Sequence, residues 1–343
     1  MSEQILIVAD RLFECRTSAH IVAREIKRQR GKYTFLSVND LLSKKDTLSF
    51  QYDKGRCRII FKKRGKSIDL KREVRSVFHW RPMRLDDFPG KEKLKKDEYK
   101  FFSGEWRNLL KGVYFSLTDR FWLNPYPINM EMQEKAYQLQ MAQQIGFTIP
   151  FTFISTSLKE SKKVFGDCQT NIIYKPFLPP EITAKDKKGK PKPLMLYTTV
   201  IKKDDFVNFE TDYATPNIFQ EYVPKKKEVR ITVIGRAVFA AECDSQKGEL
   251  SKHDWRKDIY RLPFNSHQLP PKISDQCFRL MRKLGLNYCT IDMILTPGGE
   301  YVFLELNPNG QYGWIEDMTK QPMTKNIARM LIEGTIDYKI IKK

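Results

Sequence analysis

The residues best suited to chemistry lie near the C-terminus, where two β-like runs, residues 288–295 and 300–306, are separated by a pair of glycines. Two glycines suit a two-residue hairpin turn, because such turns require positive φ. With a two-residue turn at Gly298-Gly299, Asp292 lies directly opposite Glu305. Two carboxylates that face each other repel unless a cation lies between them. The pattern therefore points to a cation site on this hairpin.

Magnesium is the cation that these side chains favour. Asn307 shares the face of Glu305, because side chains alternate along a strand with period two, and Asp, Glu and Asn oxygens are hard ligands. Ile294 and Leu304 are expected on the same face and would bury it, which makes unpaired acids there costly. We predict that Asp292, Glu305 and Asn307 hold Mg²⁺; the alternative is an exposed hairpin with incidental acids.

Magnesium held by few protein ligands usually shares its coordination shell with substrate phosphates, so cationic phosphate ligands should occur elsewhere in the chain. Lys135 stands at the start of a predicted helix, and Lys175 and Arg230 lie inside apolar, strand-like runs. A cation inside an apolar strand is costly unless its charge is matched. The alternative for each of the three is a snorkelling side chain that binds no ligand.

Several other chemistries lack their signatures. Gly65-Lys66-Ser67 fails as a P-loop because Ile60 stands where the motif requires glycine, and no GxGxxG follows the first strand-like run. No His-Arg-Asp kinase loop is present. The cysteines are scattered without a CxxC pair and the histidines lie far apart, which argues against zinc and against a disulfide framework.

The apolar runs are short. None approaches the roughly 18 residues that a membrane helix needs, and the N-terminus lacks the charged region of a signal peptide. Together with the scattered cysteines, these features predict a cytoplasmic protein with no membrane partner.

Helices and strands of mixed order must position the candidate residues. Strand-like runs occur at 5–9, 33–38, 77–81, 171–177, 194–201, 218–222, 229–234 and 237–241, with a hairpin or small meander over 48–70. Helical periodicity predicts helices at 18–28, 105–117, 131–146, 274–284 and 324–333. Lysine-rich residues 85–97 and 184–192 have loop composition. The predicted fold class is therefore α/β (α+β), with a boundary near residues 124–127.

The charge balance calls for an acidic partner. The chain has 61 Lys and Arg against 41 Asp and Glu, which gives a formal net charge of +20. Nucleic acid is the usual first candidate and an acidic peptide or phosphate-rich ligand the second; a lysine-rich, solvated surface is the plain alternative. No ribonucleoprotein-type motif is present, and Phe101-Phe102 beside Lys100 is too weak to stand for one. We therefore expect no nucleic-acid partner.

Five motifs follow one another in order along residues 120–343. They are Lys135 at the head of a helix that ends in Gly146-Phe147-Thr148-Ile149-Pro150, then Tyr174-Lys175-Pro176, Gln220-Glu221-Tyr222-Val223-Pro224, Glu228-Val229-Arg230, and Asp292 with Glu305-Leu306-Asn307-Pro308-Asn309-Gly310. This ordered set resembles the ATP-grasp superfamily of carboxylate–amine ligases.

Further motifs extend the likeness to nearly the whole chain. They are Val77-Phe78-His79-Trp80-Arg81-Pro82, Phe121-Trp122-Leu123-Asn124-Pro125, Cys243-Asp244-Ser245-Gln246, Asp254-Trp255-Arg256 and Asn307-Pro308-Asn309-Gly310-Gln311. They are similar to motifs of the microviridin-type ligases, the ATP-grasp maturases of ribosomally made peptides, also called graspetide synthetases. The resemblance implies an N-terminal pre-ATP-grasp-like domain at 1–122, a central ATP-grasp subdomain at 123–206 and a C-terminal subdomain with the Mg²⁺ hairpin at 207–343.

The resemblance also implies roles for individual residues. Lys135 and Lys175 would contact the ATP phosphates, a hinge at residues 220–223 would hold adenine, and Glu228 would contact ribose. The implied cofactor-binding set is Lys135, Lys175, Gln220, Glu221, Tyr222, Val223, Glu228, Arg230 and Asn307. The implied catalytic residues are Arg230, Arg256 and Lys175, with the two arginines neutralising the transferred phosphate and an acyl phosphate. For Asp254-Trp255-Arg256, the alternative is a buried tryptophan beside an incidental salt bridge.

The reaction implied by the resemblance has two steps. A side-chain carboxylate of a precursor peptide attacks the γ-phosphate of ATP, and a Thr or Ser hydroxyl or a Lys amine then attacks the acyl phosphate to close a ring. The implied partners are an acidic leader-and-core precursor peptide and a second copy of the chain in a homodimer. Residues 184–192 would be part of a lid or merely a solvated hairpin tip.

Three other functions stay open. An ATP-grasp ligase could instead add an amino acid to a protein tail or a small-molecule carboxylate. An inactive relative could serve as a binding scaffold, and a basic nucleic-acid-binding protein is the weakest alternative.

Overall fold

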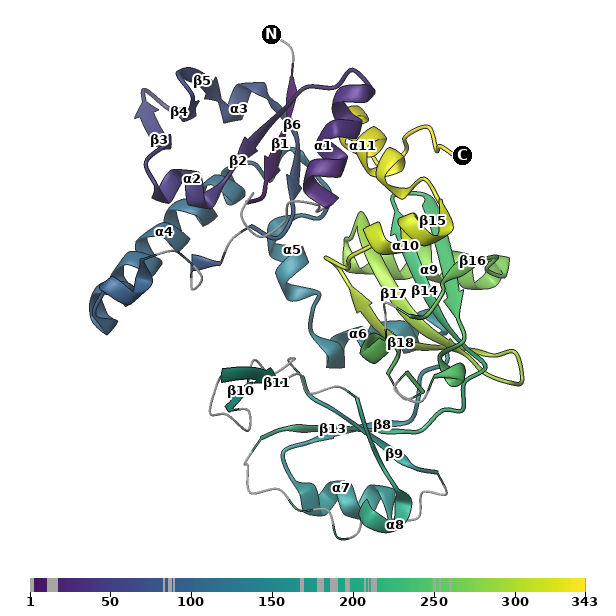
Figure 1. Ribbon diagram of the computed structural model, residues 1–343. Helices are drawn as coiled ribbons and strands as arrows, with labels where there is room; N and C mark the ends of the chain where they lie inside the picture. Colours follow the sequence, from purple (N-terminus) through teal and green to yellow (C-terminus); the bar gives the residue numbers. More distant parts are fainter. Residues whose placement is uncertain are drawn as a thin grey trace.

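The computed structural model describes residues 3–10, 18–82, 84, 85, 88, 90–166, 170–177, 182–185, 191–194, 198–206, 208, 210, 215–248, 251, 252, 254–258 and 261–342. Over these residues it consists of helices packed on several separate sheets, as Figure 1 shows. The predicted α/β (α+β) class is confirmed. None of the described helices combines the length and apolar character that crossing a membrane requires.

A parallel sheet, here called the N-terminal sheet, has the strand order β2-β1-β6-β7. Its strands are β1 (Gln4–Val8), β2 (Tyr33–Leu36), β6 (Val74–His79) and β7 (Phe121–Trp122). Ile5 and Ile7 of β1 pack with α1 (Ser18–Arg28) and α11 (Met323–Glu333), whereas Leu6 and Val8 pack with α4 (Lys96–Ser116). Both faces are thus covered, which explains why β1 is a continuous apolar run.

The predicted meander is present as β3 (Asp46–Asp53), β4 (Arg56–Lys63) and β5 (Lys66–Asp69), flanked by the short helices α2 (Val38–Leu42) and α3 (Leu70–Glu73). Gly65 has a φ of 78° in the turn between β4 and β5. Gly65 therefore lies in a hairpin turn and Lys66 and Ser67 begin β5, whereas in a P-loop these residues would begin a helix.

Two helix predictions are wrong in their bounds. Helix α4 begins at Lys96, within the predicted loop 85–97, because Glu98 caps the Lys95 backbone N–H at 2.8 Å and supplies charge to the first turn. The predicted helix 131–146 is two helices, α5 (Tyr126–Glu131) and α6 (Lys135–Ile145). Gly146 ends α6 with a φ of 93°, as expected.

An antiparallel sheet, the central sheet, has the order β12-β9-β13-β8. Its strands are β8 (Thr152–Ser155), β9 (Ile172–Lys175), β12 (Thr199–Ile201) and β13 (Asn217–Glu221), and α7 (Leu158–Phe165) and α8 (Lys203–Phe206) pack beside it (Figure 1). The predicted strand 194–201 is wrong in its bounds: residues 199–201 form β12, whereas Leu194 ends β11 (Pro191–Leu194), which pairs with β10 (Ile182–Lys185). Residues 186–190 of the predicted lid lie outside the described residues.

The C-terminal sheet is antiparallel with the order β16-β15-β14-β17-β18. Its strands are β14 (Lys227–Ile234), β15 (Ala237–Cys243), β16 (Asn265–His267), β17 (Tyr288–Leu295) and β18 (Tyr301–Asn307). Helices α6 and α9 (Pro271–Leu284) share a core with it, and α10 (Gly313–Thr319) follows β18. The 3-10 turns η3 (Ser245–Lys247) and η4 (Trp255–Asp258) lie between β15 and β16.

The β17–β18 hairpin confirms the predicted pairing of Asp292 with Glu305 but not the predicted turn. Thr296 pairs with Glu300, so the turn between them has three residues rather than two. One of them, Gly299, has a φ of 85°. Leu304 is skipped in the register and forms a bulge. The bulge compensates for the extra turn residue and restores the pairing at the carboxylates.

The sheets are joined by buried contacts that cross the predicted domain boundaries. The Ser76 hydroxyl donates to the Leu331 carbonyl at 2.6 Å, which ties β6 to α11. Asn124 Nδ2 donates to the carbonyls of Tyr288 and Pro308, both at 2.8 Å. Asn124 Oδ1 accepts the N–H groups of Asn287 at 2.9 Å and Tyr288 at 3.0 Å. The division into domains at 122 and 206 stays a prediction.

Replacing Asn124 by alanine should destabilise the protein by about 3 kcal/mol or more, because several buried backbone groups lose their partner at once. Denaturant unfolding measures this free energy. The exposed amide variant Gln143→Ala on α6 is the control and should stay within about 0.5 kcal/mol of the wild type. A loss below about 1 kcal/mol for Asn124→Ala would contradict the role of Asn124 as a joint.

Candidate active site

A cleft of about 720 Å³ lies between the central sheet and the C-terminal sheet, with Arg81, Pro82 and Arg84 of the N-terminal part also on its wall. It collects residues from distant parts of the sequence. Of the predicted site residues, those that line it are Lys135, Lys175, Gln220, Glu221, Tyr222, Val223, Glu228, Arg256, Asp292, Glu305 and Asn307. Arg230 is not on the wall.

Arg230, Asp292 and Glu305 form a row across three adjacent strands. Arg230 on β14 pairs with Asp292 on β17, and Asp292 pairs with Glu305 on β18. Arg230 Nη1 donates to both carboxylate oxygens of Asp292, at 2.8 and 2.7 Å. Burial raises the pKa of Asp292 and Glu305 raises it further, whereas Arg230 lowers it. Arg230 thus bonds one of the two carboxylates, and Arg256 also lowers the pKa of Asp292.

This row fits a divalent cation. The two carboxylates lie side by side with a single positive neighbour in their row, so a further positive charge would relieve their repulsion. Asn307 lies two residues beyond Glu305 on the same wall of the cleft, and its Oδ1 accepts the Asn309 N–H at 3.0 Å. Among the described residues, no group of three or more His, Cys, Asp and Glu side chains has metal-site geometry. A cation here would therefore be completed by Asn307 and by ligand oxygens.

Arg230 lies behind the cleft rather than on its wall. Its side chain is 9% exposed, Nη2 donates to the Gln311 carbonyl at 3.1 Å, and the guanidinium lies 5.9 Å from the Trp255 ring centroid. In this structure it holds Asp292. Direct contact of Arg230 with a transferred phosphate stays a prediction.

Three cations converge from different elements. Lys175 ends β9, Lys135 begins α6, and Arg256 lies in η4. Burial lowers the pKa of Lys175 to about 8; Lys135 and Arg256 add to this effect, and Glu305 opposes it. Burial also lowers the pKa of Lys135, whose ammonium donates to the Pro176 carbonyl at 2.6 Å. An anion in the cleft would relieve the repulsion among these three groups.

The predicted hinge, residues 220–223, leaves the central sheet and leads to β14. The Glu221 carboxylate accepts the Phe151 N–H at 2.9 Å, and the Glu221 N–H donates to the Phe151 carbonyl at 3.0 Å. The Tyr222 N–H donates to the Asn171 carbonyl at 2.9 Å. These bonds hold the segment against the neighbouring strands of the central sheet, along one wall of the cleft.

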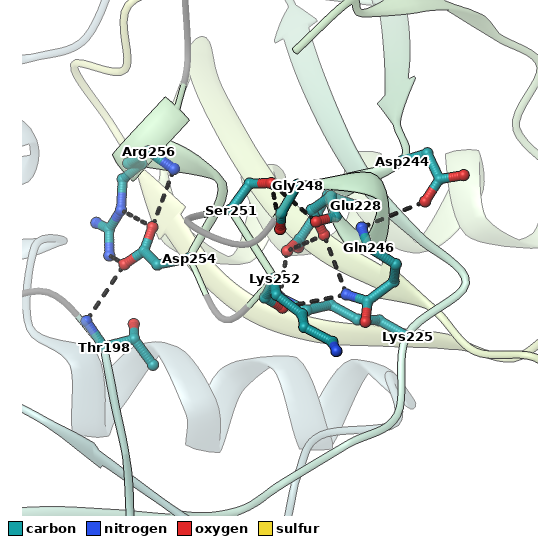
Figure 2. A network of polar contacts seen from close by, with 11 residues as sticks. Thr198, Lys225, Glu228, Asp244, Gln246, Gly248, Ser251, Lys252, Asp254 and Arg256 are labelled. Atoms are coloured by element: carbon teal, nitrogen blue, oxygen red, sulfur yellow. Dashed lines mark hydrogen bonds and ion pairs between the residues drawn. The ribbon is translucent and has the colours of Figure 1, made fainter. Parts of the chain in front are cut away.

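Glu228 lies deeper in the same wall, in the polar network of Figure 2. Lys225 Nζ and the Ser245 hydroxyl donate to its carboxylate, the latter at 3.2 Å. Burial raises the pKa of Glu228, and Lys225 opposes this rise. The predicted ribose contact would use a carboxylate that is already held in place by two donors.

Some cleft residues were missed by reasoning from the sequence. Arg81, Arg84 and Lys225 line the wall but were given no role. Arg81 Nη2 donates to the Asn309 carbonyl at 2.9 Å, and its φ is 44° although Pro82 follows. A non-glycine residue with positive φ before proline is uncommon and is often found at functional sites. The aromatic–Arg–Pro motif at residues 77–82 marked Arg81 in the sequence, but it did not predict the positive φ of Arg81.

Comparisons of the chain with protein-family models and with curated proteins find no match. Solved structures do match. A RiPP-associated ATP-grasp ligase of Chryseobacterium gregarium, solved with ADP and a leader and core peptide, has a TM-score of 0.84 and 27% identity and covers 99% of this chain and 100% of its own. The macrocyclase MdnC of Microcystis aeruginosa MRC, bound with precursor peptide MdnA, has a TM-score of 0.80 and 27% identity and covers 96% and 99%.

The likeness extends to more distant structures. The ATP-grasp ligase PsnB, complexed with a minimal precursor, Mg and ADP, has a TM-score of 0.74 at 17% identity and covers 97% of this chain and 99% of its own. At that identity the match shows a shared fold and nothing more. Over nearly its whole length the chain has the fold of the RiPP-associated ATP-grasp ligases, which confirms the family resemblance carried by its motifs.

Proposed function

We propose that this protein is an ATP-dependent ligase that closes ω-ester or ω-amide rings in a ribosomally made precursor peptide. The observation that carries the proposal is the convergence, in one cleft, of the Asp292–Glu305 carboxylate pair with the cations Lys135, Lys175 and Arg256. The similar structures, one with ADP and a leader and core peptide and the other with a precursor peptide, support the same interpretation.

The first step would join a side-chain carboxylate of the peptide to the γ-phosphate of ATP, with release of ADP. Such a transfer needs positioning and charge neutralisation rather than a protein nucleophile. Lys135 and Lys175 would bind phosphate oxygens, and Asp292, Glu305 and Asn307 would hold Mg²⁺, which when bound neutralises phosphate charge. Residues 220–223 and Glu228 would bind the adenosine.

In the second step a Thr or Ser hydroxyl, or a Lys amine, would attack the acyl carbon and expel phosphate. The bond that forms is the ester or amide, and the bond that breaks joins the acyl carbon to the phosphate oxygen. Arg256 would neutralise the charge on the departing phosphate. Water must be kept out, because it would return the acyl phosphate to the carboxylate.

The proposed peptide partner is acidic, since it carries the carboxylates that react and would be attracted by a chain of net charge +20. We retain a homodimer in the cytoplasm as part of the proposal. Nothing in the described residues favours a nucleic-acid partner over an acidic peptide.

The direct test uses the purified chain with ATP, Mg²⁺ and a short acidic peptide, containing Thr, Ser or Lys, that is encoded beside its gene. We expect the peptide to lose one water per ring and one ADP to be released per ring, as measured by mass spectrometry and a coupled assay. A gain of an amino-acid mass would favour the alternative ligase. Salt-sensitive RNA binding without ADP release would refute both.

Asp292→Ala and Glu305→Ala should both abolish turnover while leaving the fold intact. The sharper change is Glu305→Gln, which keeps the size of the side chain and should lower ADP release by about 100-fold or more because a charge at the metal is lost. Glu300→Gln, an exposed glutamate on the same hairpin, is the matched control. Wild-type ADP release by Glu305→Gln, with an unchanged melting temperature, would refute the metal assignment.

Nucleotide affinity should depend on the charge of Lys175. Because the pKa of Lys175 is about 8, the free protein carries this charge below that pH and loses it above. Calorimetric titration with Mg·ADP should show affinity falling by up to about ten-fold per pH unit above the pKa. Lys175→Arg keeps its charge throughout and should not show this fall. A pH-independent wild-type affinity would argue against a phosphate contact by Lys175.

A further inference from the structure

One hydrogen bond joins two residues of the cleft wall that come from different sheets, and Figure 2 draws it as a dashed line between Thr198 and Asp254. The Thr198 N–H donates to Asp254 Oδ2 at 3.2 Å. Thr198 immediately precedes β12, and Thr199 pairs with Tyr174, the neighbour of Lys175 on β9. Asp254 belongs to the segment between β15 and β16 of the C-terminal sheet. The contact therefore joins that segment to the sheet that carries Lys175.

The same carboxylate fixes the guanidinium of Arg256. Arg256 Nε donates to Asp254 Oδ1 at 2.8 Å and Nη2 to Oδ2 at 2.6 Å, and the Arg256 N–H donates to Oδ1 at 3.1 Å. The Asp254 side chain is 3% exposed, whereas that of Arg256 is 48% exposed. Although burial opposes its charge, the bonds from Arg256 hold the pKa of Asp254 below the ordinary value. Asp254 is thus a buried anion behind a half-exposed cation.

One edge of Arg256 remains available. Guanidinium has five N–H donors in a planar fork, and Asp254 occupies the Nε–Nη2 edge. Arg256 Nη1 has no hydrogen-bond partner among the residues that the structure describes. Because Arg256 lines the cleft, this edge is the one that can meet an anion there.

The segment that carries Asp254 has a rigid base. Trp255 lies with its ring centroid 5.4 Å from that of Phe264 and 5.3 Å from that of Trp314 on α10. Trp255 also packs against the core shared by the N-terminal and C-terminal sheets. With Trp255 held there, the contact with Asp254 limits how far Thr198 and the central sheet can lie from Arg256.

We propose that Asp254 is a positioning residue that couples closure of the central sheet over the cleft to the placement of Arg256. The inference rests on the proposed function, in which an acyl phosphate has two fates. Attack by the peptide hydroxyl or amine closes the ring and releases phosphate, whereas attack by water restores the carboxylate and releases phosphate. Asp254 favours the first fate, because its contact with Thr198 keeps the cleft closed while Arg256 is in place.

The test removes the Thr198 N–H donor. Thr198→Pro removes the N–H, and Thr198→Ala is the matched comparison because it removes the side chain and keeps the N–H. We expect Thr198→Pro to release about ten-fold more ADP per ring than Thr198→Ala, the effect of losing one hydrogen bond to a charged group. This ratio does not depend on the folded fraction of the protein. Equal ratios for the two variants would overturn the inference.

A second comparison asks whether Asp254 acts through Arg256. Asp254→Asn should raise the ratio of ADP to rings in the wild-type background and should add little in an Arg256→Lys background, because the two residues act as a unit. Independent, additive effects would overturn the inference even if Thr198→Pro did not fold.

Failure of the proposed function can be told apart from failure of this inference. If the wild type binds Mg·ADP but closes no ring in any peptide tested, the proposed function is wrong. The affinity for Mg·ADP then decides the inference: it should be about ten-fold weaker for Thr198→Pro than for Thr198→Ala. Equal affinities would overturn the inference without reference to any peptide.

Discussion

The row of Arg230, Asp292 and Glu305 across β14, β17 and β18 is the constraint on which the rest of the site depends. Two carboxylates are placed side by side at the wall of a cleft, and a single arginine in the row lies against one of them. Burial makes the charge on Asp292 expensive, and Glu305 makes it more so. Such a row is stable only with strong fixed neighbours, and it is well suited to accept a further cation.

The β17–β18 hairpin departs from an ideal hairpin in two ways, a longer turn and a bulge, and together these place Asp292 opposite Glu305. A turn with one residue more than a two-residue loop would shift the carboxylates out of register, and the bulge at Leu304 shifts them back. Bulges near active sites commonly re-aim side chains in this way. The bulge also brings Leu304 to the cleft wall beside Glu305, so an apolar side chain and a carboxylate share the same stretch of wall.

The positive charges in the cleft come from elements that are far apart in sequence. Lys135 and Lys175 belong to α6 and β9, and Arg256 belongs to the connection between β15 and β16. Each cation is held by its own local arrangement, such as the Asp254 carboxylate behind Arg256. Asn124 fixes the loop after β18 and the start of β17 to the N-terminal part. A cleft that can surround a polyanion results from joining these separately anchored pieces.

By itself the sequence determined the residue types and their local periodicity. The order of motifs was enough to predict the ATP-grasp fold. The predicted pairing of Asp292 with Glu305 is also confirmed, but it results from a three-residue turn and a bulge at Leu304 that cancel, not from the predicted two-residue turn. Period two is a local property, so it can be read from neighbouring residues, whereas the length of the turn and the bulge were not predicted. The start of α4 and the split between α5 and α6 were not predicted, because capping and exposed helix faces leave a weak apolar pattern.

Tertiary structure alone decided which charges meet. That Arg230 turns to Asp292 rather than to the cleft, that Arg81 reaches Asn309 from a positive-φ conformation, and that Thr198 touches Asp254 all depend on contacts between distant segments. Electrostatic energies fall with separation and depend on burial. The charge state of a residue such as Lys175 is therefore set by neighbours that only the fold brings within reach.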